Sequence, residues 1–374
     1  MADLRIIYHV PYPLVFENPG GSGVRPVKML RALESIGEVW LVSGHTAERK
    51  KAIAKVDAAI ARGVTFDLVY SESSTMPTAL TDPDHLPRHP FMDFAFLHRM
   101  RRHGLKVGLF YRDIYWRFDD YAPHVPRLKR LFSKAMYRYD CLAYRLAVDV
   151  LYLPSEQMAA YVPFSSKRTK PLPPGHDIVG TPPETNPAPL SLLFVGGFND
   201  HYRLHELFAA VQQCPDVHLT VCTRESEWQA ARHSYEEYLA DNIEIVHRHG
   251  EGLKELFAKA NIGVLCIEPS EYRNFAAPLK FYEYIGNGKP ILCSNHTLTG
   301  DLVTKWGIGW TVDYDRKAFV DLLHQLTAHP DQVSERRSQV LNVRMVNSWR
   351  GRAGQIVKDL TGRDVDLSVG SANS

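Results

Sequence analysis

Ten short apolar runs recur along the chain with helical patterns between them, and this alternation constrains the fold more than any other feature. Many of the runs are apolar throughout, as is typical of parallel strands covered on both faces. Strands that alternate with helices imply right-handed β–α–β units. The sequence therefore predicts an α/β fold with parallel strands at 4–10, 38–43, 66–71, 106–111, 148–154, 191–196, 217–222, 242–247, 261–267 and 290–294.

The length of the chain, 374 residues, exceeds what a single hydrophobic core usually serves. A stretch rich in proline and polar residues, 161–190, interrupts the strand–helix rhythm and precedes a fresh strand. We therefore expect two Rossmann-like, doubly wound domains that face a central cleft. The expected boundaries are 1–165 for the first domain, 166–190 for the linker, 191–345 for the second domain, and 346–374 for a C-terminal helix that crosses back to the first domain and ends in a polar tail.

Composition says more about the cellular compartment of the protein than about its function. The net charge of +2 argues neither for nor against nucleic acid, and we expect no nucleic-acid partner. No apolar run approaches the length of a membrane span, and the start "MADLRIIYHV" lacks the layout of a signal peptide. The five cysteines form no C-x-x-C pair, which favours a reducing, cytoplasmic setting over disulfides or zinc: Cys141, Cys214, Cys222, Cys266 and Cys293.

The stretch "FAAPLKFYEYIGNGKPILCS" (275–294) predicts a helix with an unusual start. Pro278 suits the first helical position, but Ala277 has no oxygen with which to cap the helix. Lys280 puts a positive charge in the first turn, where the helix dipole favours an acid. A bound diphosphate would satisfy the free N–H groups and the lysine together, so Pro278, Leu279 and Lys280 are candidate nucleotide-binding residues.

Glu283 lies three residues after Lys280 and shares a face of the same helix. A carboxylate accepts hydrogen bonds without donating any, so Glu283 matches the two hydroxyls of a ribose. The alternative is an exposed Lys–Glu pair, which stabilises a helix by about 0.2–0.5 kcal/mol. That alternative explains the pair but leaves the missing cap unexplained.

Two other strand-to-helix junctions carry glycines, which let backbone N–H groups approach a ligand closely. After the first strand, Gly21 and Gly23 lead to Arg25 and to a helix expected from about Pro26. This segment is either a substrate-binding loop or an ordinary flexible loop. At 191–207 the junction is either a site for phosphate or sugar or a plain turn, and its candidate residues are Gly197, Asn199 and Arg203.

The first half of the chain offers candidate contacts to the acceptor or the sugar at its strand ends. Arg112 and Asp113 directly follow the apolar run 106–111. Asp113 would orient a sugar, unless the two residues form a buried Arg–Asp ion pair. His9, at the end of the first strand, either bonds sugar hydroxyls or is a satisfied core histidine.

Residues 127–145 read as a basic amphipathic helix with six basic residues and a single acid, Asp140. Leucines, a phenylalanine and tyrosines supply the apolar positions. Such a helix can lie on an anionic membrane surface. The alternative is an ordinary surface helix, whose basic side faces water and whose apolar side packs on the protein core. The basic residues are Arg127, Lys129, Arg130, Lys134, Arg138 and Arg145.

The stretch "PLKFYEYIGNGKPIL" (278–292) resembles the donor-binding element of GT-B glycosyltransferases, in particular the broad family-four type known as glycosyl transferases group one. In that family a Pro-x-Lys-x-x-Glu helix, followed by Gly-x-Pro and a hydrophobic residue, lies beneath the nucleotide. The resemblance is specific at 278–290 and covers most of the chain, because further elements fall in the expected order: the glycine-rich loop with Arg25, "PSEQMAAYV" (154–162), "PPGHDI" (173–178) and "VGGFN" (195–199).

This resemblance implies a GT-B glycosyltransferase that moves a sugar from a nucleotide diphosphate sugar to an acceptor hydroxyl. The donor would bind the C-terminal domain, and a saccharide or lipid-linked saccharide acceptor would bind the N-terminal domain. It also implies retention of anomeric configuration and a role in surface polysaccharide or glycoconjugate biosynthesis. We expect no cofactor and no metal, because Lys280, Arg203 and the helix N-terminus would stabilise the charge on the leaving diphosphate. The expected location is the cytoplasm, with peripheral contact at the inner face of the cell membrane.

The resemblance is incomplete at one catalytic position. Glu283 corresponds to the second of two glutamates that lie eight residues apart in the family, but the residue eight before it is Phe275. Glu271 follows the expected Pro-Ser, yet it lies twelve residues before Glu283. The role of the first glutamate is therefore open among Glu271, Tyr272, Arg273 and the backbone of 274–277, and the candidate catalytic residues are Asp113, Glu271 and Lys280.

Two other functions remain open on the same fold. One is a nucleotide-sugar 2-epimerase or a phosphorylase; interconversion or hydrolysis of a nucleotide sugar without any acceptor would favour the epimerase. The other is a catalytically silent partner subunit that binds a nucleotide sugar, which the departure at the first glutamate keeps open.

Overall fold

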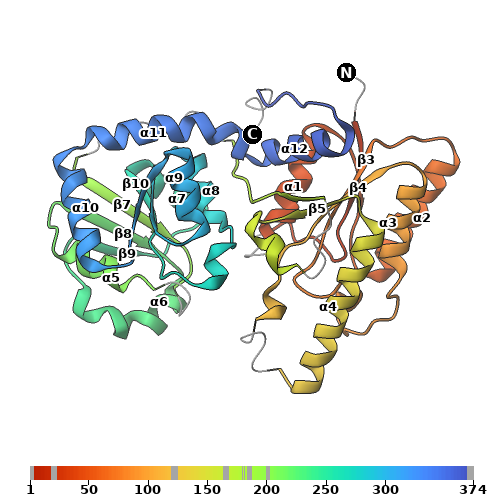
Figure 1. The fold of residues 1–374 in the computed structure, drawn as a ribbon, viewed down its shortest axis with the longest axis horizontal. Coiled ribbons are helices and arrows are strands. Elements are labelled where there is room, and N and C mark those ends of the chain that lie inside the picture. Colours follow the sequence, from red (N-terminus) through yellow and green to blue (C-terminus); the bar gives the residue numbers. More distant parts are fainter. Residues whose placement is uncertain are drawn as a thin grey trace. The chain divides into compact units, whose positions relative to one another are not determined.

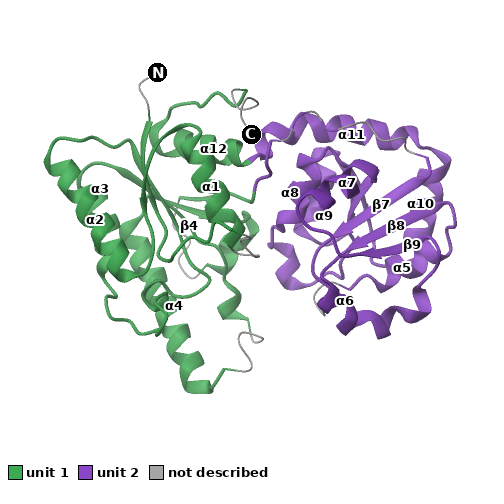
Figure 2. Ribbon diagram, turned by 180° about the vertical axis from the view of Figure 1, so that it is seen from behind, with its two compact units in different colours: residues 1–174, 349–370 green, residues 175–348, 371–374 purple. Residues whose placement is uncertain are grey.

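The chain folds into two compact units, Met1–Pro174 with Trp349–Gly370 and Gly175–Ser348 with Ser371–Ser374, called unit 1 and unit 2 (Figure 2). A computed structural model describes residues 4–17, 23–118, 125–162, 168–178, 180, 182, 188–198 and 203–368. Each unit contains a six-stranded parallel sheet with helices on both faces (Figure 1). The predicted α/β class with two doubly wound domains is confirmed.

The sheet of unit 1 has the strand order β2-β1-β3-β4-β5-β6, and all its ladders are parallel. Its strands are β1 (Leu4–His9), β2 (Gly37–Val42), β3 (Leu68–Glu72), β4 (Lys106–Phe110), β5 (Val150–Leu153) and β6 (Thr169–Pro171). Its helices are α1 (Val24–Glu34), α2 (Thr46–Ala61), α3 (Met92–Arg102), α4 (Arg127–Ala147) and α12 (Trp349–Thr361).

The last helix of the chain, α12, belongs to unit 1 and packs on α1, β3 and β4. Gly108 of β4 makes this packing possible, because a Cβ there would meet the Leu360 side chain at 3.1 Å. Helix α12 therefore completes the core of a unit whose other helices and strands end at Pro171.

The sheet of unit 2 has the strand order β12-β11-β10-β7-β8-β9, again with parallel ladders. Its strands are β7 (Leu190–Val195), β8 (Val217–Cys222), β9 (Ile243–Val246), β10 (Ile262–Leu265), β11 (Ile291–Ser294) and β12 (Gly309–Val312). Its helices are α5 (His205–Gln212), α6 (Glu225–Ala231), α7 (Glu251–Lys259), α8 (Leu279–Gly286), α9 (Leu298–Trp306), α10 (Arg316–Ala328) and α11 (Asp331–Arg344).

Two hydrophobic clusters cover the two faces of this second sheet. Leu192 and Phe194 of β7 point into the cluster formed with α5 and α10, whereas Leu193 points into the cluster formed with α8 and α9. This alternation is the two-residue period of a strand buried on both sides. It explains why the strand reads as a continuous apolar run.

All ten predicted strands are present, and the structure adds β6 and β12. β6 lies within the segment 166–190 that was expected to be a linker, so unit 1 extends to Pro174. β12 was not predicted because its run, "GWTV", is short and begins with a glycine. There is no space for a side chain at that position, because a Cβ on Gly309 would meet the Ile291 carbonyl oxygen at 1.9 Å.

Two expected helix starts need correction. α1 begins at Val24 rather than at about Pro26, with Gly23 as its N-cap. α8 begins at Leu279, and Pro278 is its N-cap rather than its first helical residue.

Each sheet has one topological switch point, where the direction of chain progression reverses. In unit 1 it lies between β1 and β3, and in unit 2 between β7 and β10. In open α/β sheets, ligands bind beyond the carboxyl ends of the strands at this point. The residues that follow these four strands are therefore the first place to look for a site. Among the described residues, no helix is long and apolar enough to cross a membrane.

Candidate functional site

The start of helix α8 lies beside the switch point of unit 2. Pro278 is the N-cap, with extended backbone angles, and within the described part of the chain no side chain caps the helix. Leu279, Lys280 and Phe281 form the first turn, which contains no acid. The N–H groups at such a helix start favour an anion.

Tyr284 fixes this helix to the switch point. The Val195 N–H donates to the Tyr284 hydroxyl over 3.0 Å, and that hydroxyl lies within donating distance of the Leu193 and Val264 carbonyl oxygens, at 3.1 and 3.3 Å. Strand β10 pairs with β7 only through its first two residues, Ile262 and Gly263, so the tyrosine takes the place of ladder bonds where the strands diverge. Gly263 is needed because a Cβ there would meet the Tyr284 ring at 2.4 Å.

Lys280 lies directly over Gly196, the glycine that follows β7. A Cβ on Gly196 would meet the Lys280 Nζ at 1.5 Å, and Gly196 has a φ of +153°. The Nζ also lies 4.9 Å from the centre of the Phe194 ring. Burial lowers the pKa of Lys280 to about 8, and Glu283 opposes this shift only in part. The site therefore holds an ammonium group in a place where its charge is poorly solvated.

Glu227 organises the glycine loop next to this lysine. The Phe198 N–H donates to the Glu227 carboxylate over 2.8 Å, which fixes the loop that contains the half-buried Gly197. On the neighbouring strand end, the buried Thr223 hydroxyl has no hydrogen-bond partner among the described residues. Asn199, a predicted contact in this loop, lies outside the described residues.

The remaining predicted residues of unit 2 lie around this centre with varied exposure. Arg203 forms an exposed ion pair with Glu268 at 3.6 Å. Glu271 is exposed in the 3-10 helix Glu271–Asn274. Phe275, which holds the position where the family has its first glutamate, is 2% exposed and packs on the Tyr272 ring. The chain therefore buries an apolar ring at that position.

The switch point of unit 1 is organised by a buried carboxylate, Glu72, at the end of β3. Glu72 is fully buried and pairs with Arg25 at 3.2 Å and Arg112 at 3.4 Å, and it accepts from the Tyr70 hydroxyl at 2.9 Å. Burial alone would lower the pKa of Arg25, but Tyr70 and Glu72 outweigh it and raise that pKa above its ordinary value. The Arg25 guanidinium also lies 3.5 Å from the centre of the Phe110 ring.

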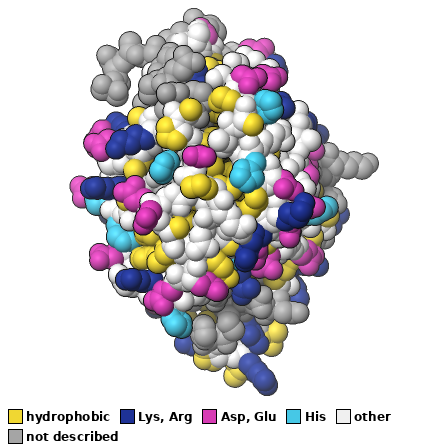
Figure 3. All heavy atoms as spheres, turned by 90° about the vertical axis from the view of Figure 1, so that its left-hand side faces the viewer, with side chains coloured by type: hydrophobic (Ala, Val, Ile, Leu, Met, Phe, Trp, Pro, Cys, Tyr) yellow, Lys and Arg dark blue, Asp and Glu magenta, His cyan; other side chains and the backbone are white. Residues whose placement is uncertain are grey.

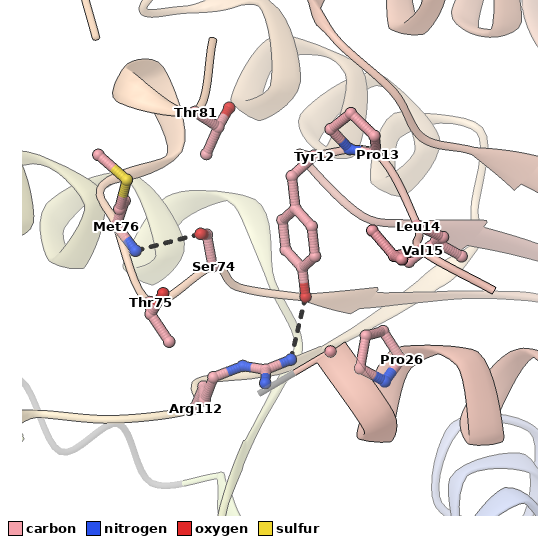
Figure 4. A pocket seen from close by; sticks show the side chains of 11 residues that line it. Tyr12, Pro13, Leu14, Val15, Pro26, Ser74, Thr75, Met76, Thr81 and Arg112 are labelled. Carbon is pink, nitrogen blue, oxygen red and sulfur yellow. Dashed lines mark hydrogen bonds between the residues drawn. The ribbon is translucent and has the colours of Figure 1, made fainter. Parts of the chain in front are cut away.

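A cavity of about 360 Å³ opens next to this network. Arg112 donates to the Tyr12 hydroxyl over 3.0 Å, and Figure 4 shows this pair between the residues that follow β1 and those that follow β3. Burial raises the pKa of Tyr12 to about 12, so its hydroxyl stays protonated near neutral pH. Gly23 lines the cavity at the start of α1, whereas the predicted Gly21 lies outside the described residues.

Two predicted contact residues of unit 1 serve the local structure. His9 is 2% exposed, and its ring nitrogens lie 2.8 Å from the Ser71 hydroxyl and 2.9 Å from the Asp93 carboxylate. Both ring nitrogens thus have partners within unit 1, which is the arrangement of a satisfied core histidine. The Asp113 carboxylate accepts from the Tyr115 N–H over 2.9 Å and opens the 3-10 helix Tyr115–Arg117.

No group of three or more histidine, cysteine, aspartate or glutamate side chains that could hold a metal ion occurs in the described ranges. Three Asp-x-Asp tripeptides exist in the sequence, but their carboxylates serve the local structure. Asp82 accepts from Thr46 and Asp84 pairs with Arg88. Asp313 accepts from Asn295, and Asp315 caps α10. In the last of them Asp364 pairs with Lys358, and Asp366 accepts from the Ser368 N–H.

Sequence reasoning missed three residues that shape these sites: Glu72, Glu227 and Tyr284. Glu72 had a usable signal, because a carboxylate at the end of a strand must find a partner when it is buried. Glu227 and Tyr284 act through backbone groups far away in the sequence, and no local pattern marks them.

Comparison with known proteins agrees with this arrangement. Residues 182–341 match the family model described as Glycosyl transferases group 1. No curated protein matches the sequence. Among solved structures, HepE from Anabaena in complex with UDP and glucose has a TM-score of 0.62 at 12% identity, covering 96% of this chain and 100% of that one.

Two further solved structures are similar over nearly the whole chain. Sucrose-phosphate synthase from Thermosynechococcus elongatus has a TM-score of 0.57 at 16% identity, covering 94% of this chain and 97% of that one. α,α-Trehalose 6-phosphate synthase from Burkholderia multivorans has a TM-score of 0.55 at 13% identity, covering 97% of this chain and 99% of that one. Residues 182–341 thus match the glycosyl transferases group 1 model, and the fold of the chain is that of these solved GT-B structures.

Proposed function

We propose that the protein transfers a sugar from a nucleotide diphosphate sugar, bound by unit 2, to a hydroxyl of an acceptor. The observation that carries this proposal is the position of Lys280. Its Nζ lies over Gly196 at the switch point, in the first turn of a helix without a side-chain cap. A diphosphate there would meet the ammonium group and the helix N–H groups together.

The chemistry follows from the charge that develops during transfer. When the bond between the anomeric carbon and the diphosphate oxygen breaks, negative charge accumulates on the leaving diphosphate. Lys280 and the start of α8 would stabilise that charge in a poorly solvated place, where electrostatic interactions are strong. Glu283, one turn further along α8, would accept hydrogen bonds from the ribose hydroxyls.

We further propose that the reaction needs no metal and retains the anomeric configuration. Lys280 and the helix start would supply the stabilisation that a metal ion provides elsewhere. Retention is suggested by the family resemblance, with the leaving phosphate taking the proton from the acceptor hydroxyl. The donor base is open, and uridine is the first to test because the HepE structures contain UDP or UDP-glucose.

The acceptor in this proposal is a saccharide or lipid-linked saccharide of a surface polysaccharide or glycoconjugate, used at the cytoplasmic face of the cell membrane. The cavity beside Tyr12 and Arg112, about 360 Å³, supports an acceptor site in unit 1. Arginine and tyrosine side chains donate hydrogen bonds that suit sugar hydroxyls or a phosphate.

One observation favours a second candidate function, a catalytically silent subunit that binds nucleotide sugar. Phe275 is buried at the position where the family has its first glutamate. An active enzyme must place another group near the donor sugar, and the exposed Glu271 is the nearest carboxylate in the sequence.

Thermal-shift measurements with UDP, GDP, ADP, dTDP and CMP test donor binding first. The matching diphosphate at 100 times its Kd should stabilise the protein by about 2.7 kcal/mol. Release of that diphosphate from the corresponding nucleotide sugars, with and without saccharide acceptors, then tests turnover. Lys280→Ala and Glu283→Ala should abolish the thermal shift and slow turnover by 100-fold or more, whereas Lys305→Ala, at an exposed lysine elsewhere in unit 2, should change neither.

Each alternative gives a different result in this experiment. Full turnover in both site variants would show that the donor site is wrong. Interconversion of the nucleotide sugar without an acceptor would identify an epimerase. Binding of the diphosphate without turnover of any nucleotide sugar would identify the silent subunit.

A further inference from the structure

Helix α4 packs on unit 1 with only one of its sides. Its buried residues recur every three or four positions and lie in its second half: Tyr137, Asp140, Cys141, Tyr144 and Ala147. Figure 1 shows the first half of α4 extending beyond the sheet of unit 1. At 100° per residue, the buried positions share one stripe of the helix.

The opposite side of α4 carries a second apolar stripe, which is exposed. It consists of Leu128, Leu131, Phe132, Leu142 and Leu146, and we call it the leucine stripe. Their exposed fractions are 82%, 63%, 45%, 62% and 70%. The same helical geometry places these five positions about half a turn away from the buried stripe. A helix on the surface of a globular protein normally presents polar residues there.

A neighbouring aromatic residue extends the leucine stripe. Phe91 is 70% exposed, and its ring lies edge-on to Tyr139 at 6.1 Å. Tyr139 is half-buried and lies on the same side of α4 as Leu128 and Leu146. Contiguous exposed apolar surface of this kind marks an interaction site more often than scattered leucines do.

Basic residues line one edge of the leucine stripe. We call Arg127, Lys134, Arg138 and Arg145 the basic edge; their spacings of seven, four and seven residues keep them on one line along the helix. Lys129 and Arg130 add charge at the exposed end. The one acid of α4, Asp140, is buried on the packed side. By contrast, the face of the molecule in Figure 3 mixes acidic and basic side chains.

The charge pattern decides which occupant fits. A second copy of this chain, docked stripe to stripe, would bring two strongly basic helices together, and like charges at that distance repel. An anionic lipid surface suits both features of α4. Its acyl chains offer the leucine stripe an apolar medium, and its dense layer of phosphates attracts the basic edge. Among the described helices none can span a bilayer, so the contact is with the membrane surface.

We propose that α4 docks unit 1 on an anionic membrane, with the leucine stripe in the acyl-chain boundary and the basic edge on the lipid phosphates. Helix α4 lies parallel to the membrane plane, and its 21 residues span about 30 Å. The proposal rests on unit 1 alone and needs no nucleotide sugar. Its outcome is therefore separate from that of the proposed transfer reaction.

Co-sedimentation with lipid vesicles tests the proposal. Phosphatidylcholine vesicles that contain about one third phosphatidylglycerol should bind the full-length protein, and phosphatidylcholine alone should bind it far more weakly. Binding should fall as salt rises from about 0.1 to 1 M, because the Debye length shrinks from about 10 to 3 Å. Phe132→Trp should give a blue-shifted fluorescence with the anionic vesicles only.

Two double variants separate the apolar and electrostatic parts. Leu131→Ser/Leu142→Ser should weaken binding to anionic vesicles at least tenfold, and its matched control, Leu86→Ser/Val346→Ser, alters two exposed apolar residues elsewhere and should not. Arg138→Gln/Arg145→Gln should weaken it by about 10–30-fold, unlike Lys51→Gln/Lys305→Gln at exposed lysines. All four variants should keep the melting temperature of the unaltered protein.

The proposal is overturned if the unaltered protein ignores anionic vesicles at low salt, or if the leucine-stripe variant binds them as well as the unaltered protein does. It is also overturned if the protein is a dimer by light scattering that Leu131→Ser/Leu142→Ser converts to a monomer. In that case a second copy covers the stripe.

Discussion

Arg25 in unit 1 and Lys280 in unit 2 hold the same place in two similar units. Each lies in the first turn of a helix that follows a switch-point strand, and within the described part of the chain neither helix has a side-chain cap. Each cation also lies over a phenylalanine of its sheet, Phe110 or Phe194. The two helix starts therefore present the same local chemistry.

The two cations differ in the direction in which the protein shifts their pKa values. Arg25 faces the buried carboxylate of Glu72 at 3.2 Å, and its pKa is raised. Burial instead lowers the pKa of Lys280 to about 8. In unit 1 the attraction of a buried carboxylate outweighs the effect of burial on the cation, whereas in unit 2 burial outweighs the attraction of Glu283 and Glu227. An incoming diphosphate would add to the stabilisation of the Lys280 charge.

The largest expected effect comes from removing the internal anion of unit 1. Glu72→Ala leaves Arg25 and Arg112 buried without their carboxylate and should cost about 3–5 kcal/mol of unfolding free energy, measured by urea denaturation. Glu38→Ala is the matched control, because Glu38 forms an exposed ion pair with Arg5 and such pairs contribute about 0–1 kcal/mol. If the two variants lost the same free energy of unfolding, the buried Glu72 carboxylate would stabilise the protein no more than an ordinary surface ion pair does.

Lys280→Met should stabilise the protein while weakening donor binding. The variant keeps most of the length of the side chain but removes a charge that is poorly solvated, so the unfolding free energy at pH 7 should rise by about 1–3 kcal/mol. The folded pKa of Lys280, about 8, lies below its unfolded value, so the unfolded chain binds more protons between these two values. The difference between variant and unaltered protein should therefore be full below pH 8 and disappear above about pH 10.5.

Urea denaturation at several pH values measures that difference. A loss of stability in Lys280→Met at pH 7 would mean that the protein already balances the lysine charge, as it does for Arg25. Lys305→Met, at an exposed position of the same unit, should leave the stability unchanged.

Gly196→Ala should displace Lys280 without removing its charge. The new Cβ occupies the place of the Lys280 Nζ, and the φ of +153° disfavours a side chain, so we expect a loss of about 1–2 kcal/mol in stability. The affinity for the nucleoside diphosphate, measured by calorimetry, should fall about tenfold. Gly63→Ala is the control, because Gly63 has a φ of +88° with no atom within 4 Å; it should share the loss of stability and leave the affinity unchanged.

The smallest expected effect is on the pH dependence of donor affinity. Only the ammonium form of Lys280 attracts a diphosphate, and in the free protein this form is lost as pH rises through about 8. The Kd for the diphosphate should therefore rise by up to tenfold per pH unit above 8, measured by calorimetry. Lys280→Met should show a flat profile over this range, and an identical slope in that variant would assign the titration to another group.

How much could be predicted from sequence differs between the fold and the sites. The ten strands and the parallel architecture follow from local periodicity, because a strand buried on both faces must be apolar at every position. The unusual start of α8 was also visible in Pro278 and Lys280, since capping depends on residues next to the helix. β6 was hidden because its three residues lie in a proline-rich stretch, where a strand survives only at the edge of a sheet.

The partners of the site residues could not be predicted, because they come from distant parts of the chain. Lys280 lies against Gly196, and Arg25 meets Glu72 and Phe110. The strand order of each sheet decides these pairings, and a periodic pattern carries no record of strand order. His9 is an example: its position at a strand end suggested a sugar contact, but local sequence could not show that its ring nitrogens lie against Ser71 and Asp93.

The sequence by itself determined the alternation of strands and helices, the division into two units and the presence of a helix without a capping side chain after Ala277, because each depends on residues close to one another in the chain. The exact start of that helix, at Leu279, came from the structure. Only the tertiary structure decided which charges are balanced and which apolar stripe of α4 is covered. The physical reason is that solvation and pairing depend on what lies beside a group in space. A helical period of 3.6 residues reveals a stripe without showing what packs against it.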